Sequence, residues 1–513
     1  MKRTFCAVLA GLLAGPHAFA GEPWLAPGDL QVRHDIQMLV DDGVIDIPLS
    51  AWPIPTSDVA AALAAARQKY GLELETPAAG DPAKSAKGFT LSESQFAALT
   101  RLRRVVSSED SGFFAELRGA ARPEELRTFR NEPRDAYEFA VGYAGYFGEH
   151  FGGRLEAAVV DSPPDGDNYR LDGSYLAGKF GNWVVTLGAQ DRWWGSGWEG
   201  SLILTNNARP VPAIAIDRAE STPFESKWLH WIGPWRLTTF LGYMDDDRGD
   251  YDHPLLFGFR VSARPLDGLE LSLERTAQLC GQGRSCTWSD FWNMWWGNDN
   301  AGENVDPDQE PGNQLAGWHV RWASPIGRWP YALYWQHTGE TIDNQIPRPY
   351  RSEDLAGGEY WGDLASGGSW RLNLEYANTL CGGTENGEKL WDCAYNSGIF
   401  YGAGYRYKGR VMGHSMDGDA LQYAARFLLI PETDTTWSFM VRYTELNRGG
   451  AFPDTLNSVA PGPEDWLSVD ASYRRPVRKG WVEVGVGVDR EGRKWDDDTA
   501  VLPRGTFTWH YGF

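Results

Sequence analysis

The sequence has little sulfur and little positive charge, and it lacks long apolar runs. Cysteine occurs 5 times and methionine 7 times in 513 residues. Beyond the amino-terminal segment no stretch approaches the ~20 uncharged residues that a membrane-spanning helix needs, so the chain could cross a membrane only as strands. Lys and Arg number 48 against 69 Asp and Glu. That balance argues against a nucleic-acid partner, because binding nucleic acid relies on basic side chains that neutralise phosphates.

The amino terminus has the pattern of a secretory signal. Lys2 and Arg3 precede an apolar run at residues 5–15, and the small residues Ala18 and Ala20 flank Phe19. This pattern predicts a signal peptide over residues 1–20. The mature chain is then expected in an oxidising compartment outside the cytoplasm.

The remaining cysteines form two close pairs. Cys280 with Cys286, and Cys381 with Cys393, are predicted to be disulfides that close small loops. A four-thiolate metal site is the alternative, which the absence of a two-residue spacing disfavours. We expect no metal and no cofactor.

Residues 21–110 have helical periodicity. An apolar stripe spans residues 30–40, an Ala-rich run follows over 57–70, and Ser92 with Gln95 forms a capping-box pattern before a third apolar stripe. These signals predict three short helices in a periplasmic segment.

The last nine residues, GTFTWHYGF, alternate strictly. Phe507, Trp509, Tyr511 and Phe513 would share one face of a strand, and the other face carries small or polar residues. A terminal strand of this kind resembles the closing strand of outer-membrane barrels, which the barrel-insertion machinery recognises through a final Phe. Its aromatic face suits membrane lipid. The alternative is the last strand of a soluble sandwich.

Residues 111–513 read as alternating strands whose links are in turn short and long. We count about 18 antiparallel strands, an all-β transmembrane barrel with long extracellular loops. Every link on the periplasmic side is expected to be short. So wide a barrel needs a plug, for which the three helices and inward-folded loops are candidates. Without one, the chain would be a channel for oligosaccharides or small solutes.

Planar hydrogen-bond donors and indoles cluster between residues 190 and 218. Arg and Asn donate to sugar hydroxyls or carboxylates, and indoles stack on the C–H faces of sugar rings. A polysaccharide site is one interpretation, and a lumen ion-pair ladder with a simple loop turn is the other. The candidate residues are Asp191, Arg192, Trp193, Trp194, Asn206, Asn207, Arg209, Asp217 and Arg218.

A second aromatic group lies at residues 288–296, where helical spacing would place Trp288, Trp292 and Trp295 on one face. Trp292 and Trp295 are candidates for a lectin platform or a membrane-rim anchor. We favour packing into the barrel mouth as a plug.

Catalysis has weaker support. His414, Ser415, Asp417 and Asp419 supply the residue types of a hydrolase triad, but no Gly-x-Ser-x-Gly elbow surrounds Ser415. Acidic runs are expected to be solvated faces, since none has the spacing of a calcium loop.

Several stretches together resemble the Wzi-type outer-membrane capsule-assembly proteins. The resemblance implies an 18-stranded barrel with a periplasmic helical bundle, in the outer membrane of a Gram-negative bacterium. It further implies a non-enzymatic surface lectin that holds capsular or another exopolysaccharide at the cell exterior. The stretches are 29–31 (DLQ), 43–45 (GVI), 50–53 (SAWP), 191–195 (DRWWG), 206–210 (NNARP), 275–278 (RTAQ), 311–315 (PGNQL) and 405–414 (YRYKGRVMGH).

Overall fold

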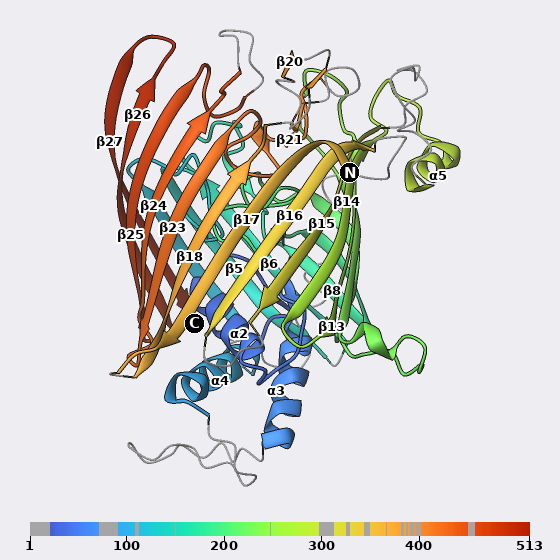
Figure 1. Ribbon diagram of the computed structural model, residues 1–513, viewed down its shortest axis with the longest axis vertical. Helices are drawn as coiled ribbons and strands as arrows, with labels where there is room; N and C mark the ends of the chain where they lie inside the picture. Colours follow the sequence, from blue (N-terminus) through green and yellow to red (C-terminus); the bar gives the residue numbers. More distant parts are fainter. Residues whose placement is uncertain are drawn as a thin grey trace.

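The computed structural model is a closed antiparallel barrel with helices at one end (Figure 1). It describes residues 21–70, 91–107, 112–148, 150–246, 248–296, 312–324, 329–342, 349–365, 367–380, 384–385, 388–389, 394–396, 402–449 and 457–513. Cys381 and Cys393 lie outside the described residues. Within this part of the chain, no helix has both the length and the apolar character to span a membrane.

The wall contains 18 strand positions, as the sequence predicts. Two labelled strands, β7 and β8, pair with the same neighbour β6 and share one position. The barrel closes where β27 pairs with β4. The wall strands are β4 (Gly112–Ala120), β5 (Tyr137–Phe147), β6 (Phe151–Val160), β7 (Tyr169–Arg170), β8 (Tyr175–Phe180), β9 (Trp183–Ala189), β11 (Pro212–Arg218), β12 (Trp235–Tyr243), β13 (Leu255–Leu266), β14 (Leu269–Leu279), β15 (Gly312–Ala323), β16 (Tyr331–Ile342), β17 (Pro349–Asp363), β18 (Gly368–Asn378), β23 (Leu421–Pro431), β24 (Thr436–Leu446), β25 (Glu464–Val477), β26 (Gly480–Arg493) and β27 (Asp498–Gly512).

Alternation along each strand separates an apolar outer face from a polar interior. In β24, Trp437, Phe439 and Val441 are exposed. The alternate positions Met440 and Arg442 are buried. The closing strand follows the predicted pattern, with Phe507 exposed and Thr508 buried. The outer face therefore suits lipid, and the inner face carries the groups that hold the contents of the lumen.

Three helices form where the sequence predicts them: α2 (Leu30–Asp41), α3 (Thr56–Tyr70) and α4 (Glu93–Val106). The side chain of Asp29 caps α2, and Ser92 with Gln95 makes both hydrogen bonds of a capping box at α4. We call the end of the barrel with α3, α4 and the carboxyl terminus the helical end, and the opposite end the loop end (Figure 1).

One link at the helical end contradicts the expectation that all links there are short. Residues 219–234 join β11 to β12 and contain the 3-10 helix η1 (His230–Ile232). Trp228 and Trp231 in this link are 87% and 68% exposed.

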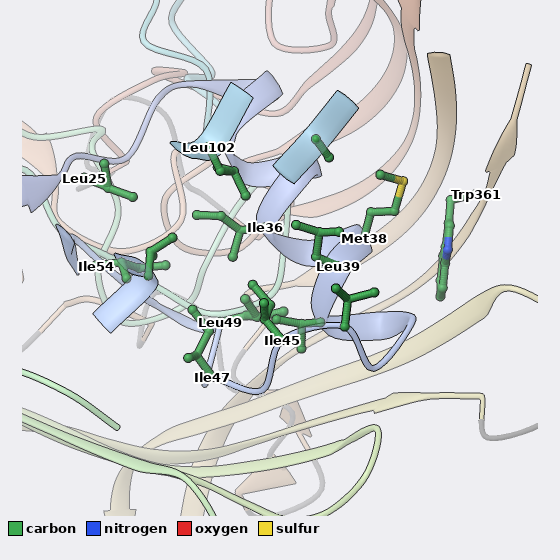
Figure 2. Close-up of a cluster of buried hydrophobic side chains, with 14 of the residues drawn as sticks. Leu25, Ile36, Met38, Leu39, Ile45, Ile47, Leu49, Ile54, Leu102 and Trp361 are labelled. Carbon is green, nitrogen blue, oxygen red and sulfur yellow. The ribbon is translucent and has the colours of Figure 1, made fainter. Parts of the chain in front are cut away.

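The amino-terminal segment packs inside the barrel at its helical end. Ile36 and Leu39 of α2 lie in one buried cluster with Leu102 of α4, and Trp361 of β17 closes the cluster from the wall (Figure 2). The apolar stripe that predicts α2 is therefore the face that fills the lumen. Buried charges fix it, since Arg321 on β15 donates to Asp41 at 2.9 Å.

A loop from the opposite end meets this segment within the lumen. Strand β2 (Ala51–Trp52) pairs with β10 (Trp193–Trp194), and Arg33 donates to the carbonyl oxygens of Ser196 and Gly197 at 2.7 and 2.9 Å. We call residues 24–56 together with 190–211 the plug. Three further two-stranded ladders are not part of the wall sheet: β1 (Trp24–Leu25) with β3 (Ile54–Pro55), β19 (Thr384–Glu385) with β20 (Glu388–Lys389), and β21 (Arg406–Tyr407) with β22 (Arg410–Val411).

Candidate functional site

The two adjacent candidate tryptophans lie inside the plug. Trp193 and Trp194 are 0% and 1% exposed. Phe129 packs edge-on against Trp193 at 5.3 Å, and Trp194 packs against Phe240 at 5.7 Å. The two indoles point to opposite faces of the β2–β10 ladder and are buried in separate clusters, so they position the loop by packing and offer no face to a ligand.

Asn206 and Asn207 are also buried, and their contacts hold the loop-end segments together. Asn207 donates through Nδ2 to the carbonyl oxygen of Val411 at 2.9 Å. Arg134 donates to the carbonyl oxygen of Asn206 at 2.9 Å and to Asp191 at 2.8 Å. Asn207 thereby joins the plug to the β21–β22 hairpin, and Asn206 joins it to the link between β4 and β5. Both roles go beyond the loop turn that the sequence indicated.

Three charged candidates lie along or near β11: Arg192, Asp217 and Arg218, of which the last two are neighbours at the carboxyl end of the strand. The Arg192 guanidinium stacks over Phe240 at 4.3 Å from the ring centroid. Asp217 is buried on the inner face of β11. Arg218 ends that strand at the helical end, where it stacks over Trp235 at 3.9 Å. Because β11 runs from the loop end to the helical end, Arg218 does not join Asp191 in one site.

Arg209 is the candidate that reaches the surface of the loop end. It binds Asp165, Asp167 and Asp172, each at 2.8 Å. Lys408, at the tip of the β21–β22 hairpin, donates to the same Asp167 at 3.0 Å and lowers the pKa of that carboxyl through the hydrogen bond. Two chain segments far apart in sequence thus share one charge cluster.

Carboxylates of this cluster and of a neighbouring ion pair are accessible at the loop end. Asp167 and Asp245 keep 43% and 50% of their side chains exposed, and both bind Lys408. Arg410 pairs with Glu125 at 2.9 Å, and the Glu125 side chain is 42% exposed. We call Glu125, Asp167, Arg209, Asp245, Lys408 and Arg410 the loop-end charged surface.

Sequence reasoning missed most of that surface. Lys408 and Arg410 flank Gly409 in the 405–414 stretch, where a turn glycine between two basic residues signals an exposed hairpin tip. Beneath the surface, a cavity of about 30 Å³ touches Asp191, Arg192 and Arg209. It has room for water but none for a sugar ring.

The Trp-rich segment is not in the barrel mouth, and the expectation that it plugs the barrel is wrong. It forms α5 (Trp288–Trp296), whose Trp295 packs against the outward-facing Phe257 and Phe259, each at 5.6 Å. Figure 1 places α5 outside the wall near the loop end. The predicted disulfide between Cys280 and Cys286 is present beside it.

A larger cavity of about 780 Å³ remains in the lumen along the inner faces of β4, β5 and β6. It extends from Phe513 at the helical end to Asp191, where the ion pair with Arg134 lies. Its lining mixes both charges, as with Arg154 and Glu156. Within the described ranges, no group of three or more His, Cys, Asp or Glu side chains is placed to hold a metal ion.

A closed barrel with an apolar outer face, a polar lumen and a plug built from both ends defines a membrane β-barrel that holds segments of its own chain in its lumen. Residues 116–498 match the family model of the capsule assembly protein Wzi. The chain belongs to this family, and it is an outer-membrane β-barrel.

Two relatives match over nearly the whole chain. A 55.8 kDa protein from the cps region of Klebsiella pneumoniae is 29% identical over 469 residues, which cover 89% of this chain and 85% of the relative. The solved structure of Wzi from Escherichia coli superposes with a TM-score of 0.79 at 24% identity, over 96% of this chain and 100% of that one. That Wzi is described as an outer-membrane protein involved in group 1 capsule assembly and as a carbohydrate-binding β-barrel. The similarity confirms the fold that the resemblance implied.

Proposed function

We propose that the protein is a non-enzymatic lectin of the outer membrane, which holds capsular or another exopolysaccharide at its loop end. In this proposal the loop end faces the cell exterior and the helical end faces the periplasm. Family membership and the carbohydrate binding ascribed to the Escherichia coli Wzi support it. The observation that carries it is the loop-end charged surface.

That surface has the chemistry that sugar hydroxyls require. Each hydroxyl both donates and accepts a hydrogen bond. The exposed carboxylates of Asp167 and Asp245 can accept from hydroxyls, and Lys408 and Arg410 can donate to ring oxygens, hydroxyls or acidic substituents. Asp191 and Arg209 remain in the proposed site, and the buried candidates Trp193, Trp194, Asn206 and Asn207 support it from below.

The surroundings of His414 support the absence of catalysis. The side chains of His414 and Ser415 are buried, and the imidazole packs against Gly200. Asp417 instead binds Arg406 at 2.6 Å and the backbone N–H of Ser458 at 2.8 Å. A triad needs its acid on the histidine and its hydroxyl within reach of substrate, whereas Asp417 is held by Arg406 and Ser458, and Ser415 is buried.

The experiment is a screen of the purified barrel against immobilised bacterial polysaccharides, repeated with the triple variant Asp167→Asn/Asp245→Asn/Arg410→Ala. We expect affinity for the bound polymer to fall at least about tenfold, because a lost charge-assisted hydrogen bond is worth about 1.5–3 kcal/mol. The matched control is Asp496→Asn/Asp497→Asn/Arg493→Ala, the same three changes in or beside the β26–β27 turn. If the wild type binds no polysaccharide, the lectin proposal fails. If only the control variant loses binding, the polysaccharide site is not the loop-end charged surface.

A second candidate function, a channel for small solutes, is favoured by the 780 Å³ lumen cavity. Conductance across a planar lipid bilayer separates the two. We expect little current from the wild type, because the plug and the Arg134–Asp191 pair lie across the path. A steady large conductance would favour the channel.

A further inference from the structure

Helix α5 lies on the part of the barrel that faces lipid. Its Phe291 packs edge-on against Phe257 at 6.0 Å, and Trp295 covers Phe257 and Phe259. Met294 on the same helix face is fully buried. The two phenylalanines point outward, because the intervening residues of β13 point into the lumen. The helix therefore occupies a strip of wall that lipid would otherwise cover.

Both ends of α5 are held against the wall. At its start, the backbone N–H of Thr287 donates to Asp290 at 2.7 Å, and the Cys280–Cys286 disulfide ties the preceding loop to the end of β14. At its end, Arg275 donates to the carbonyl oxygens of Trp295, at 3.0 Å, and Met294. The Thr287 bond caps the first turn of α5, and the disulfide and Arg275 tie the helix to the wall at two points.

Arg275 is on the outward face of β14. Leu271 and Leu273, at every second position before it, share this face and are 44% and 61% exposed. A guanidinium on the lipid face is unfavourable unless it is paired. The carboxyl end of α5 supplies carbonyl oxygens with partial negative charge, so the docked helix shields this arginine from lipid.

The exposed side of α5 carries Trp288 and Trp292 beside the polar Ser289 and Asn293. Trp288 and Trp292 are 79% and 50% exposed, and they continue the lipid-facing surface of the wall outward. Figure 1 shows α5 below the tips of β26 and β27, which extend further at the loop end. Tryptophan concentrates at the boundary between acyl chains and headgroups, because an indole is apolar yet carries one N–H donor.

We propose that α5 is a membrane-boundary anchor, with Trp288 and Trp292 inserted among the lipids of the leaflet at the loop end. Its partner is the lipid surface and not the polysaccharide, so Trp292 and Trp295 leave the proposed lectin site. Docked on the barrel, α5 sets the depth of this side of the wall in the bilayer. The proposal depends on the barrel and holds whether or not the loop-end charged surface binds sugar.

The test places an environment-sensitive fluorophore at Trp292→Cys, with a label at Asp497→Cys in the β26–β27 turn as the matched control. The barrel is reconstituted into vesicles of phosphatidylcholine and phosphatidylglycerol, with unsubstituted protein as the background for native thiols. Lipids with a nitroxide near the headgroup should quench the 292 label several-fold more than the 497 label, and iodide in the buffer should do the reverse. Equal access of iodide to both labels, without nitroxide quenching at 292, overturns the proposal.

A second variant separates lipid from polysaccharide. Trp288→Ser/Trp292→Ser should fold normally, as judged by heat-dependent migration in gels, because both side chains are exposed. Its polysaccharide binding should equal that of the wild type. Loss of binding in the folded double variant would assign these indoles to the lectin and overturn the anchor.

Discussion

Arg426 on the barrel wall and Glu199 in the plug form a bidentate ion pair inside the lumen. Arg426 Nη2 donates to Glu199 Oε2 at 2.9 Å, and its Nε donates to the other carboxylate oxygen. Both side chains are buried, and Nη1 of the same arginine donates to Ser438 at 2.8 Å. One contact thereby joins the loop-end half of the plug to β23 and β24.

Removing the Glu199 carboxylate should loosen the plug. Glu199→Ala leaves a buried guanidinium without its partner, which costs about 3–5 kcal/mol. Urea unfolding in detergent, followed by tryptophan fluorescence, measures the loss. The control is Glu445→Ala, which breaks the more exposed pair with Arg448 and should cost about 0–1 kcal/mol. Equal losses would mean that the Arg426 pair does not stabilise the plug.

A charge on the outer face should be penalised according to its depth in the bilayer. Val486 lies midway along β26 and is 65% exposed, whereas Val501 is 63% exposed and pairs with Arg490 near the loop end. Val486→Arg should cost about 2–4 kcal/mol and Val501→Arg about 0–1, because lipid surrounds only the middle of the strand. Refolding equilibria in vesicles measure both. Similar costs would contradict this assignment of the lipid band.

Acid should weaken the packing around His414. Burial, aided by the nearby Arg442 charge, lowers the pKa of His414 from 6.5 to about 3. Between these values the unfolded chain binds a proton that the folded chain does not, so the free energy of unfolding falls as pH drops below 6.5. One such group contributes about 2 kcal/mol between about pH 6.5 and about pH 5. Urea unfolding as a function of pH should be less steep for His414→Asn, and an identical pH dependence would count against this account.

Gly200 is where the plug passes closest to that histidine. A Cβ added at Gly200 would lie 2.0 Å from Nε2 and 2.2 Å from Cδ2 of the buried His414 ring. Gly200→Ala should therefore cost about 1–3 kcal/mol by overpacking. Gly249→Ala is the control, since nothing lies within 4 Å of its added Cβ, and thermal unfolding compares the two. An unchanged thermal stability of Gly200→Ala would show that the His414 ring can shift to accommodate the added methyl group.

Much of the framework could be predicted because it depends on residues close in sequence. Strand alternation has a period of two residues, so the aromatic face of β27 can be read from Phe507 and its neighbours alone. The capping box at Ser92 and the disulfide from Cys280 to Cys286 also join residues a few positions apart. These features need no knowledge of the rest of the chain.

The candidate site was predicted less well because its residues acquire their roles across the fold. Trp193 resembles a stacking platform in the sequence, and only its pairing with Trp52 makes it interior. Arg209 appears free until Asp165 and Asp167 meet it from another loop. Local sequence specifies which groups are present but not which side of a loop becomes buried.

The sequence by itself determined the strand and helix pattern, the apolar outer face and the closing strand, since each follows from short-range periodicity. Only the tertiary structure decided that the plug forms from both ends, that Arg218 lies at the opposite end of the barrel from Asp191, and that α5 packs outside the wall. The physical reason is that closure of the barrel brings together side chains more than a hundred residues apart, as with Glu199 and Arg426, and burial then depends on which partner each charge or ring meets.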